Sequence, residues 1–162
     1  MNTRRLQIAL TVGILSGVAV TANVQRGPQP QRLTLAEAQT IIDTAHKTAA
    51  EMNLRLSIAV VDARGDLIAL GRMPGAGAGT TDTAIGKAML SAIYGQPSLA
   101  LVGRASNPAT QGLNEASGGR LRFLQGAVPI IRGGYVVGAV AGSGATGQQD
   151  EQIAAAGLAG LP

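Results

Sequence analysis

Few side chains in this sequence can carry the chemistry of catalysis or metal binding, and His46 is the first of them. It is the single histidine among 162 residues, and the chain has no cysteine. One imidazole without a thiolate leaves only carboxylates to complete a zinc site, so the sequence predicts no metal centre. Three roles remain open for His46: a ligand, an acid or base, or a boundary residue on a helix.

Acids and hydroxyls show no hydrolytic pattern. No two carboxylates stand at helical spacing with a further polar ligand, and Ser143 lacks the G-x-S-x-G spacing of a nucleophile elbow. The glycines within 138–147 form either an anion-binding turn or a close backbone packing. Met73 and Met89 are either soft ligands for iron or core residues. The sequence alone leaves these alternatives open.

The charge and the aromatic content of the chain predict that it does not bind nucleic acid. The chain carries a net charge of +4, but residues 1–22 contain two arginines and no acid. The remainder has 11 basic and 9 acidic residues, a net charge of +2 that gives no basic surface for a phosphate backbone. The three aromatic residues, Tyr94, Phe123 and Tyr135, are too few for a base-stacking platform.

Residues 1–22 have the composition of a secretory signal peptide. Two arginines precede an uncharged apolar run, and small residues stand at both positions that a signal peptidase inspects. The alternative is an uncleaved membrane anchor, because the run approaches the length of a spanning helix. Residues 23–32, rich in Pro and Gln, predict a flexible leader before a domain over 33–162. We therefore expect an exported protein, periplasmic or extracellular, that meets the membrane only through its signal segment.

Hydrophobic periodicity and turn residues predict the elements of the domain. Capping boxes begin the first and last helices at Thr34 and Thr146, and Pro129 indicates that its strand lies at a sheet edge or begins there. Two hairpins without βαβ alternation predict an α+β fold, with a central antiparallel sheet of about five strands flanked by helices. The expected elements are a helix over 35–53, strands over 57–61 and 67–70, a helix from Thr80, Thr81 or Asp82 to Gly95, a short helix over 97–105, a polar loop over 106–119, strands over 120–124, 128–131 and 135–141, and a helix up to Leu158.

Short motifs follow one another along the domain in an order that is typical of one family. They are residues 57–62, Gly65, Leu70, 72–73, Asp82, 87–88, 126–130, Gly134, 137–139, 143–144 and 149–151. These motifs resemble the GlcG/HbpS family, which includes the C-terminal domain of PduO, and the resemblance covers about Leu33 to Leu161. It implies a small α+β domain that forms homo-oligomers and, in the best-known members, binds haem.

The resemblance further implies a haem site at the polar loop before the expected strand over 120–124. Family members often carry threonines where this chain has Asn114 to Ser117, so a hydroxyl ligand for iron is assigned to Ser117. Arg120 and Arg122 suit haem propionates, because guanidinium groups form paired hydrogen bonds with carboxylates. The alternative for both arginines is the protection of a strand edge by charge.

These residues together predict a binding protein for a small ligand, with haem in a groove between subunits as the first candidate. His46 matches no motif of the family and is included as a possible ligand on chemical grounds alone. One alternative is an enzyme acting on a small organic acid, with His46 or Asp82 as acid or base. Another is a ligand-free accessory or structural oligomer. Binding is favoured over catalysis because the sequence contains no recognisable nucleophile or catalytic pair.

Overall fold

The fold consists of one antiparallel sheet with helices on both faces. The computed structural model describes residues 31–162, so the predicted signal peptide and residues 23–30 of the predicted leader lie outside the described residues. Within residues 31–162, no helix has the length and apolar character needed to cross a membrane. The elements are α1 (Leu35–Glu51), β1 (Ser57–Asp62), β2 (Leu67–Arg72), α2 (Thr80–Tyr94), the 3-10 helix η1 (Ser98–Arg104), α3 (Pro108–Ala116), β3 (Ala127–Arg132), β4 (Tyr135–Ser143) and α4 (Gly147–Ala159).

The sheet has the strand order β2-β1-β4-β3, and every neighbouring pair is antiparallel. β1 pairs with both β2 and β4, which places Ser57 opposite Arg72 on one side and Ser143 on the other. β3 lies at an edge of the sheet. This confirms the prediction from Pro129, because proline has no N–H to donate to a second neighbouring strand.

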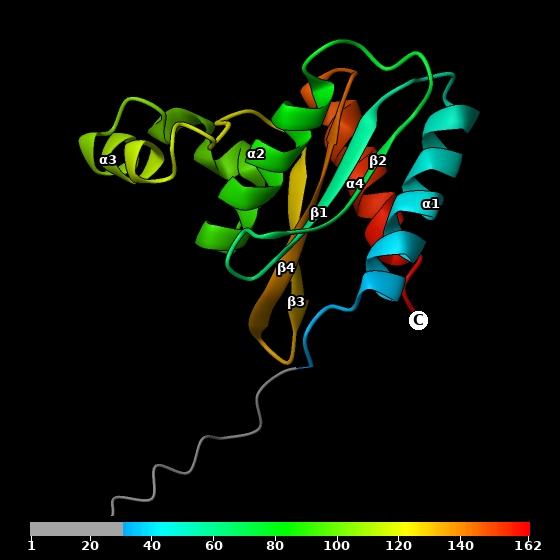
Figure 1. The fold of residues 1–162 in the computed structure, drawn as a ribbon, viewed down its shortest axis with the longest axis horizontal. Helices are drawn as coiled ribbons and strands as arrows, with labels where there is room; N and C mark the ends of the chain where they lie inside the picture. Colours follow the sequence, from blue (N-terminus) through cyan, green and yellow to red (C-terminus); the bar gives the residue numbers. More distant parts are fainter. Residues whose placement is uncertain (1–30) are drawn as a thin grey trace, which may run out of the picture.

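The helices form two layers, one on each face of the sheet (Figure 1). α1 and α4 pack against each other on one face, and α2 covers the other. Successive residues of β1 point to opposite faces. Ile58 and Val60 therefore join the core beneath α1 and α4, whereas Ala59 and Val61 join the core beneath α2.

The two halves of the core differ in the size of their side chains. Beneath α1 and α4, large branched residues such as Ile41, Ile58 and Ile153 fill the space. Beneath α2, alanines dominate, and they come from the helix and from three strands. These are Ala59, Ala84, Ala88, Ala92, Ala127, Ala139 and Ala141. Small side chains on both surfaces let α2 pack closely on the sheet, so this half of the core is filled largely without aromatic rings.

The prediction of a polar loop over 106–119 is wrong, because this segment contains the helix α3. Asn107 caps this helix, with its Oδ1 accepting a hydrogen bond from the Ala109 N–H at 2.9 Å. Pro108 occupies the first helical position, where its missing N–H costs nothing. Leu113 then packs against the core half beneath α2. The Asn-Pro pair that suggested a loop is therefore the start signal of a helix.

The expected strand over 120–124 is also absent from the described sheet, which has four strands rather than about five. The hydrogen bonds of this segment go to helices. The Arg122 N–H donates to Gly86 O of α2 at 3.2 Å, and the Leu121 N–H donates to Asn114 Oδ1 of α3 at 2.9 Å. An alternating pattern of side chains does not form a strand when the backbone N–H groups of the segment bond to helices instead of to a neighbouring strand.

The start of α2 differs from the prediction in one detail. The N-cap is Gly79, in the left-handed region at φ 73°, and no hydroxyl or carboxylate side chain caps the helix. Thr80, which the sequence offers as a cap, instead donates its hydroxyl hydrogen to Gly77 O at 2.9 Å. The end of the helix at Gly95, also left-handed at φ 63°, is as predicted.

The first turn of α1 holds a carboxylate in a dense set of hydrogen bonds. Thr34 donates to Glu37 Oε2 from its N–H at 2.7 Å and from its hydroxyl at 2.8 Å. Arg132 Nη2 of β3 donates to Glu37 Oε1 at 2.7 Å. These contacts, with the Thr34 backbone first and Arg132 second, lower the pKa of Glu37 from 4.5 to about 2.

The lowered pKa of Glu37 predicts a specific acid sensitivity. Its carboxylate stabilises the fold fully above pH 4.5, and this stabilisation is lost as the pH falls from 4.5 toward 2, because over that range the unfolded state takes up a proton that the folded state does not. In urea unfolding at pH 6 and pH 3, we expect Glu37→Gln to show a smaller drop in midpoint than the unmodified protein. Glu51→Gln, at the exposed end of α1, is the charge-matched control and should keep the full drop.

Candidate functional site

The C-terminal end of α3 brings four of the five predicted site residues together. Asn114 lies in the last turn of the helix, and Ser117 is its C-cap residue. The chain then turns through glycines 118–119, both in the left-handed region at φ 69° and 70°. This turn leads directly to Arg120 and Arg122, so the four side chains occupy one short stretch of surface.

Asn114 and Ser117 both make structural hydrogen bonds. Asn114 Oδ1 accepts from the Leu121 N–H at 2.9 Å, which fastens the segment after α3 to the helix. Ser117 Oγ donates to Leu113 O at 2.8 Å, one turn back in the same helix. The hydroxyl oxygen of Ser117 still has lone pairs to offer a ligand. Asn114, in contrast, uses its carbonyl oxygen to position the two arginines.

Arg120 and Arg122 are held by backbone carbonyls. Arg120 Nε donates to Ser117 O at 3.0 Å, and Arg122 Nη1 donates to Gly119 O at 2.7 Å. Neither arginine is in an ion pair with any of residues 31–162, so both retain N–H groups that can bind a carboxylate. Because residues 120–124 form no strand, the alternative of a charged strand edge does not apply to them.

His46 lies elsewhere, on the opposite face of the sheet. It belongs to α1, and its half-buried ring contacts β2, with Nε2 3.3 Å from Gly71 O. A carbonyl oxygen can only accept, so this contact is a hydrogen bond in the tautomer that has the proton on Nε2 and the lone pair on Nδ1. α3 contributes Leu113 to the core on the other side, and Figure 1 shows α1 and α3 at opposite sides of the molecule. One protomer therefore does not bring His46 to the two arginines.

The other sequence candidates are packed in the core. Met89 is 3% exposed in the core half beneath α2, and Met73 packs against the other half. Ser143 is buried at the end of β4. A Cβ on Gly144 would come within 2.6 Å of the Leu56 side chain, which favours close packing over an anion-binding turn. In the part of the chain that the structure describes, no three His, Asp or Glu side chains are grouped to hold a metal ion.

A buried ion pair between Lys87 and Asp150 is the feature that sequence reasoning missed. Lys87 Nζ of α2 lies 2.8 Å from Asp150 Oδ2 of α4, and the residues are only 3% and 2% exposed. The ammonium group also donates to Gly142 O at 3.1 Å, and Asp150 Oδ1 accepts from the Ala145 N–H at 3.0 Å. The pair thus joins helices from the two faces of the sheet at the end of β4.

The surroundings of this ion pair indicate a structural role. Gly126, at φ 136°, packs directly against it, and a Cβ there would lie 2.7 Å from Lys87 Nζ and 2.9 Å from Asp150 Cβ. No substrate atom can reach charges that are enclosed in this way. A sequence signal for the lysine did exist, because Lys87 shares the inward face of α2 with Ala84, Ala88 and Ser91. Nothing in the sequence identified which of the nine acids would be its partner.

Comparison with known proteins places this chain in a family. The domain is an α+β sandwich of helices around a four-stranded antiparallel sheet, with an arginine-bearing surface after α3. The family model for HbpS-like proteins, described as haem degrading protein HbpS-like, matches residues 33–159. The chain therefore belongs to the HbpS-like family, as its motifs predict.

Solved structures confirm the α+β fold. The chain is similar to a double mutant of HbpS from Streptomyces reticuli, with 28% identity, a TM-score of 0.72 and 99% of both chains covered. The protein ORFY from Klebsiella pneumoniae is 29% identical at a TM-score of 0.75, over 83% of this chain and 94% of that one. PduOC, solved as a haem complex, is 23% identical at a TM-score of 0.72, over 81% and 96%, and shares the fold.

Breaking the buried ion pair should strongly destabilise the domain. Lys87→Met leaves the Asp150 carboxylate buried without a cation, so we expect the free energy of unfolding in urea to fall by about 3–5 kcal/mol. The double variant Lys87→Met, Asp150→Leu removes both charges and should lose less than the single variant. Lys47→Met, on the exposed face of α1, is the matched control and should change stability by less than about 0.5 kcal/mol. Equal losses in Lys87→Met and Lys47→Met would contradict the structural role of the pair.

Proposed function

We propose that this protein binds haem between protomers, with Arg120 and Arg122 holding the propionates. Two findings support the proposal: the chain belongs to the HbpS-like family, and PduOC, which shares its fold, crystallised with haem. The observation that carries it is the pair of arginines after α3. Both are fixed by backbone carbonyls and still have N–H groups for an anion.

The surface next to the arginines has the apolar character that a porphyrin requires. Leu124 follows Arg122 by two residues and is 51% exposed. Leu99 of η1 is 52% exposed, and the residue before it is fixed to the start of β3, where Ser98 Oγ accepts a hydrogen bond from the Ala127 N–H at 2.9 Å. An exposed leucine two residues from Arg122 suits an apolar macrocycle that carries carboxylates.

The iron ligand in this proposal comes from one of two places. Ser117 lies beside the arginines and offers a hydroxyl oxygen, which is a weak ligand when neutral. In the tautomer with the proton on Nε2, His46 offers the stronger Nδ1 lone pair and donates to Gly71 O, as metal-bound histidines usually donate to a carbonyl. Because His46 and the arginines lie on opposite faces of one domain, a site that uses both needs a second protomer. With His46 as the ligand, haem therefore lies in a groove between the subunits of a homo-oligomer.

Titration of the purified protein with hemin tests the proposal through the Soret band. We expect a shifted Soret band that saturates, and a dissociation constant raised about tenfold by Arg120→Gln and by Arg122→Gln, because each removes a charge-assisted hydrogen bond. Arg55→Gln, an exposed arginine before β1, is the charge-matched control and should bind as the unmodified protein does. A spectrum identical to that of free hemin would make the proposal wrong.

The same titration assigns the iron ligand. If the imidazole is the ligand, His46→Ala is expected to shift the Soret maximum and Ser117→Ala is expected to leave the maximum unchanged. The reverse pattern assigns the iron to Ser117. Size-exclusion chromatography with and without hemin then measures whether the His46 pattern depends on a second protomer. Specific binding with a spectrum unaffected by either variant would refute both ligand assignments while leaving haem binding in place.

A further inference from the structure

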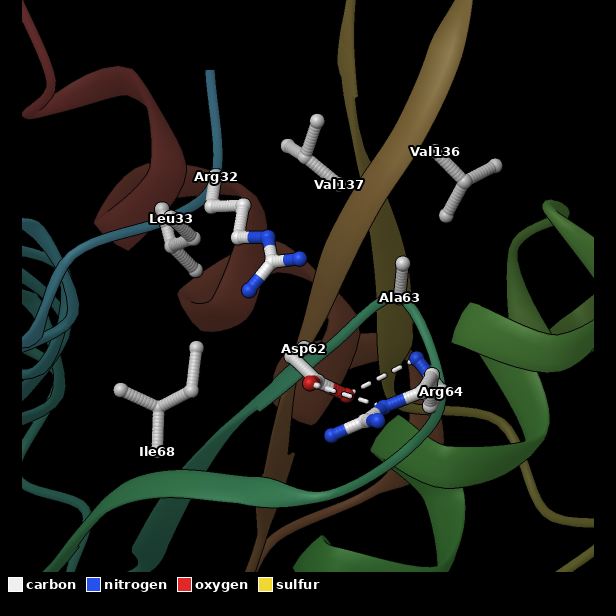
Figure 2. A pocket seen from close by; sticks show the side chains of 8 residues that line it. All are labelled: Arg32, Leu33, Asp62, Ala63, Arg64, Ile68, Val136 and Val137. Atoms are coloured by element: carbon white, nitrogen blue, oxygen red, sulfur yellow. Dashed lines mark hydrogen bonds and ion pairs between the residues drawn. The ribbon is translucent and has the colours of Figure 1, made fainter. Parts of the chain in front are cut away.

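A second candidate binding site lies at the C-terminal end of β1, next to Asp62. A cavity of about 370 Å³ opens there between the chain before α1, the turn after β1 and the start of β4. Figure 2 shows the side chains around it. None of the residues proposed above for haem binding lines this cavity. Its volume is at the lower end of the range for small-molecule sites, about 300–1,000 Å³.

One wall of the cavity is apolar and firmly held. It consists of Leu33, Ile68 and Val137, which come from the chain before α1, from β2 and from β4. Leu33 and Val137 are only 8% and 5% exposed, and Ile68 packs against the same core half beneath α1 and α4. The wall therefore belongs to the rigid core, and it can pack against a ring or a short chain without rearranging.

Two of the charged groups at the cavity already satisfy each other. Asp62 Oδ1 accepts the N–H groups of Arg64 and Asp66 at 2.8 and 3.0 Å, which closes the turn after β1. Asp62 Oδ2 lies 3.6 Å from Arg64 Nε, and Arg64 Nη2 lies 3.0 Å from Asp66 Oδ2. Arg64 is thus shared between Asp62 and Asp66, so the side chains of this turn carry one more negative charge than positive.

Arg32 is the charge that this turn does not neutralise. Figure 2 shows its guanidinium group extending over the cavity, between Leu33 and the Asp62–Arg64 pair. Within residues 31–162, no ion pair or side-chain hydrogen bond joins Arg32 to an acceptor. Among the lining residues, Arg32 is therefore the cation that is left to bind an anion, and it faces an apolar wall.

From this arrangement we propose that the cavity binds a small organic monocarboxylate with an apolar body. The carboxylate receives paired hydrogen bonds from the Arg32 guanidinium, and the body packs against Leu33, Ile68 and Val137. A monoanion fits better than a phosphate dianion, because Asp62 repels additional negative charge. An apolar wall also contributes nothing to a fully hydrated inorganic anion.

Benzoate and its neutral isostere benzamide test this proposal on the purified protein. In titrations followed by two-dimensional amide NMR, we expect benzoate to shift the signals of Leu33, Ile68 and Val137 and to bind more tightly than benzamide. Arg32→Gln should weaken benzoate binding about tenfold and leave benzamide binding unchanged. Arg55→Gln makes the same change of charge at the opposite end of β1 and should leave both affinities unchanged.

Three outcomes would overturn the proposal. Equal affinities for benzoate and benzamide would show that no carboxylate is recognised. Equal weakening by Arg32→Gln and Arg55→Gln would indicate attraction by overall charge, and shifts confined to residues outside the cavity would place the ligand elsewhere. Arg120→Gln, which tests the haem proposal, should not alter benzoate binding. The two proposals share no lining residue, so either can fail while the other stands.

Discussion

The buried contact between Lys87 and Asp150 is the constraint on which the arrangement of the two helical layers depends. Such a pair adds little net free energy compared with an apolar replacement, but any arrangement that separates the charges is heavily penalised. It therefore fixes α2 relative to α4 through the end of the sheet. Gly86 O, in the residue before Lys87, accepts a hydrogen bond from the Arg122 N–H. The position of the arginines after α3 therefore depends on the position of α2, which the ion pair fixes.

Local signals in the sequence were sufficient for most of the elements. The capping boxes at Thr34 and Thr146 both form as expected, because each needs only residues within one turn of a helix. A cap signal of the same kind precedes α3, but its residues also fit the start of a turn. Asn107 followed by Pro108 is common in turns, and it is also a helix cap followed by the favoured first residue. Local chemistry alone does not distinguish these two uses.

The remaining differences depend on partners that are distant in sequence. Residues 120–124 alternate as a strand does, but their backbone groups bond to α2 and α3 instead of to a neighbouring strand. The candidate site shows the same limit. Asn114, Ser117 and the arginines fall together because they are close in sequence, whereas the place of His46 follows from which face of the sheet α1 covers. No pattern of residue types along the chain encodes that choice of face.

The unequal core halves give the two faces of the sheet opposite tolerances to sequence change. Beneath α2, residues such as Ala88 and Ala139 are fully buried between surfaces that are already close, so added methyl groups force the layers apart. Beneath α1 and α4, residues such as Ile41 and Ile153 fill larger spaces, so the loss of methyl groups leaves voids. During evolution, substitutions to larger side chains are thus disfavoured beneath α2, and substitutions to smaller side chains are disfavoured beneath α1 and α4.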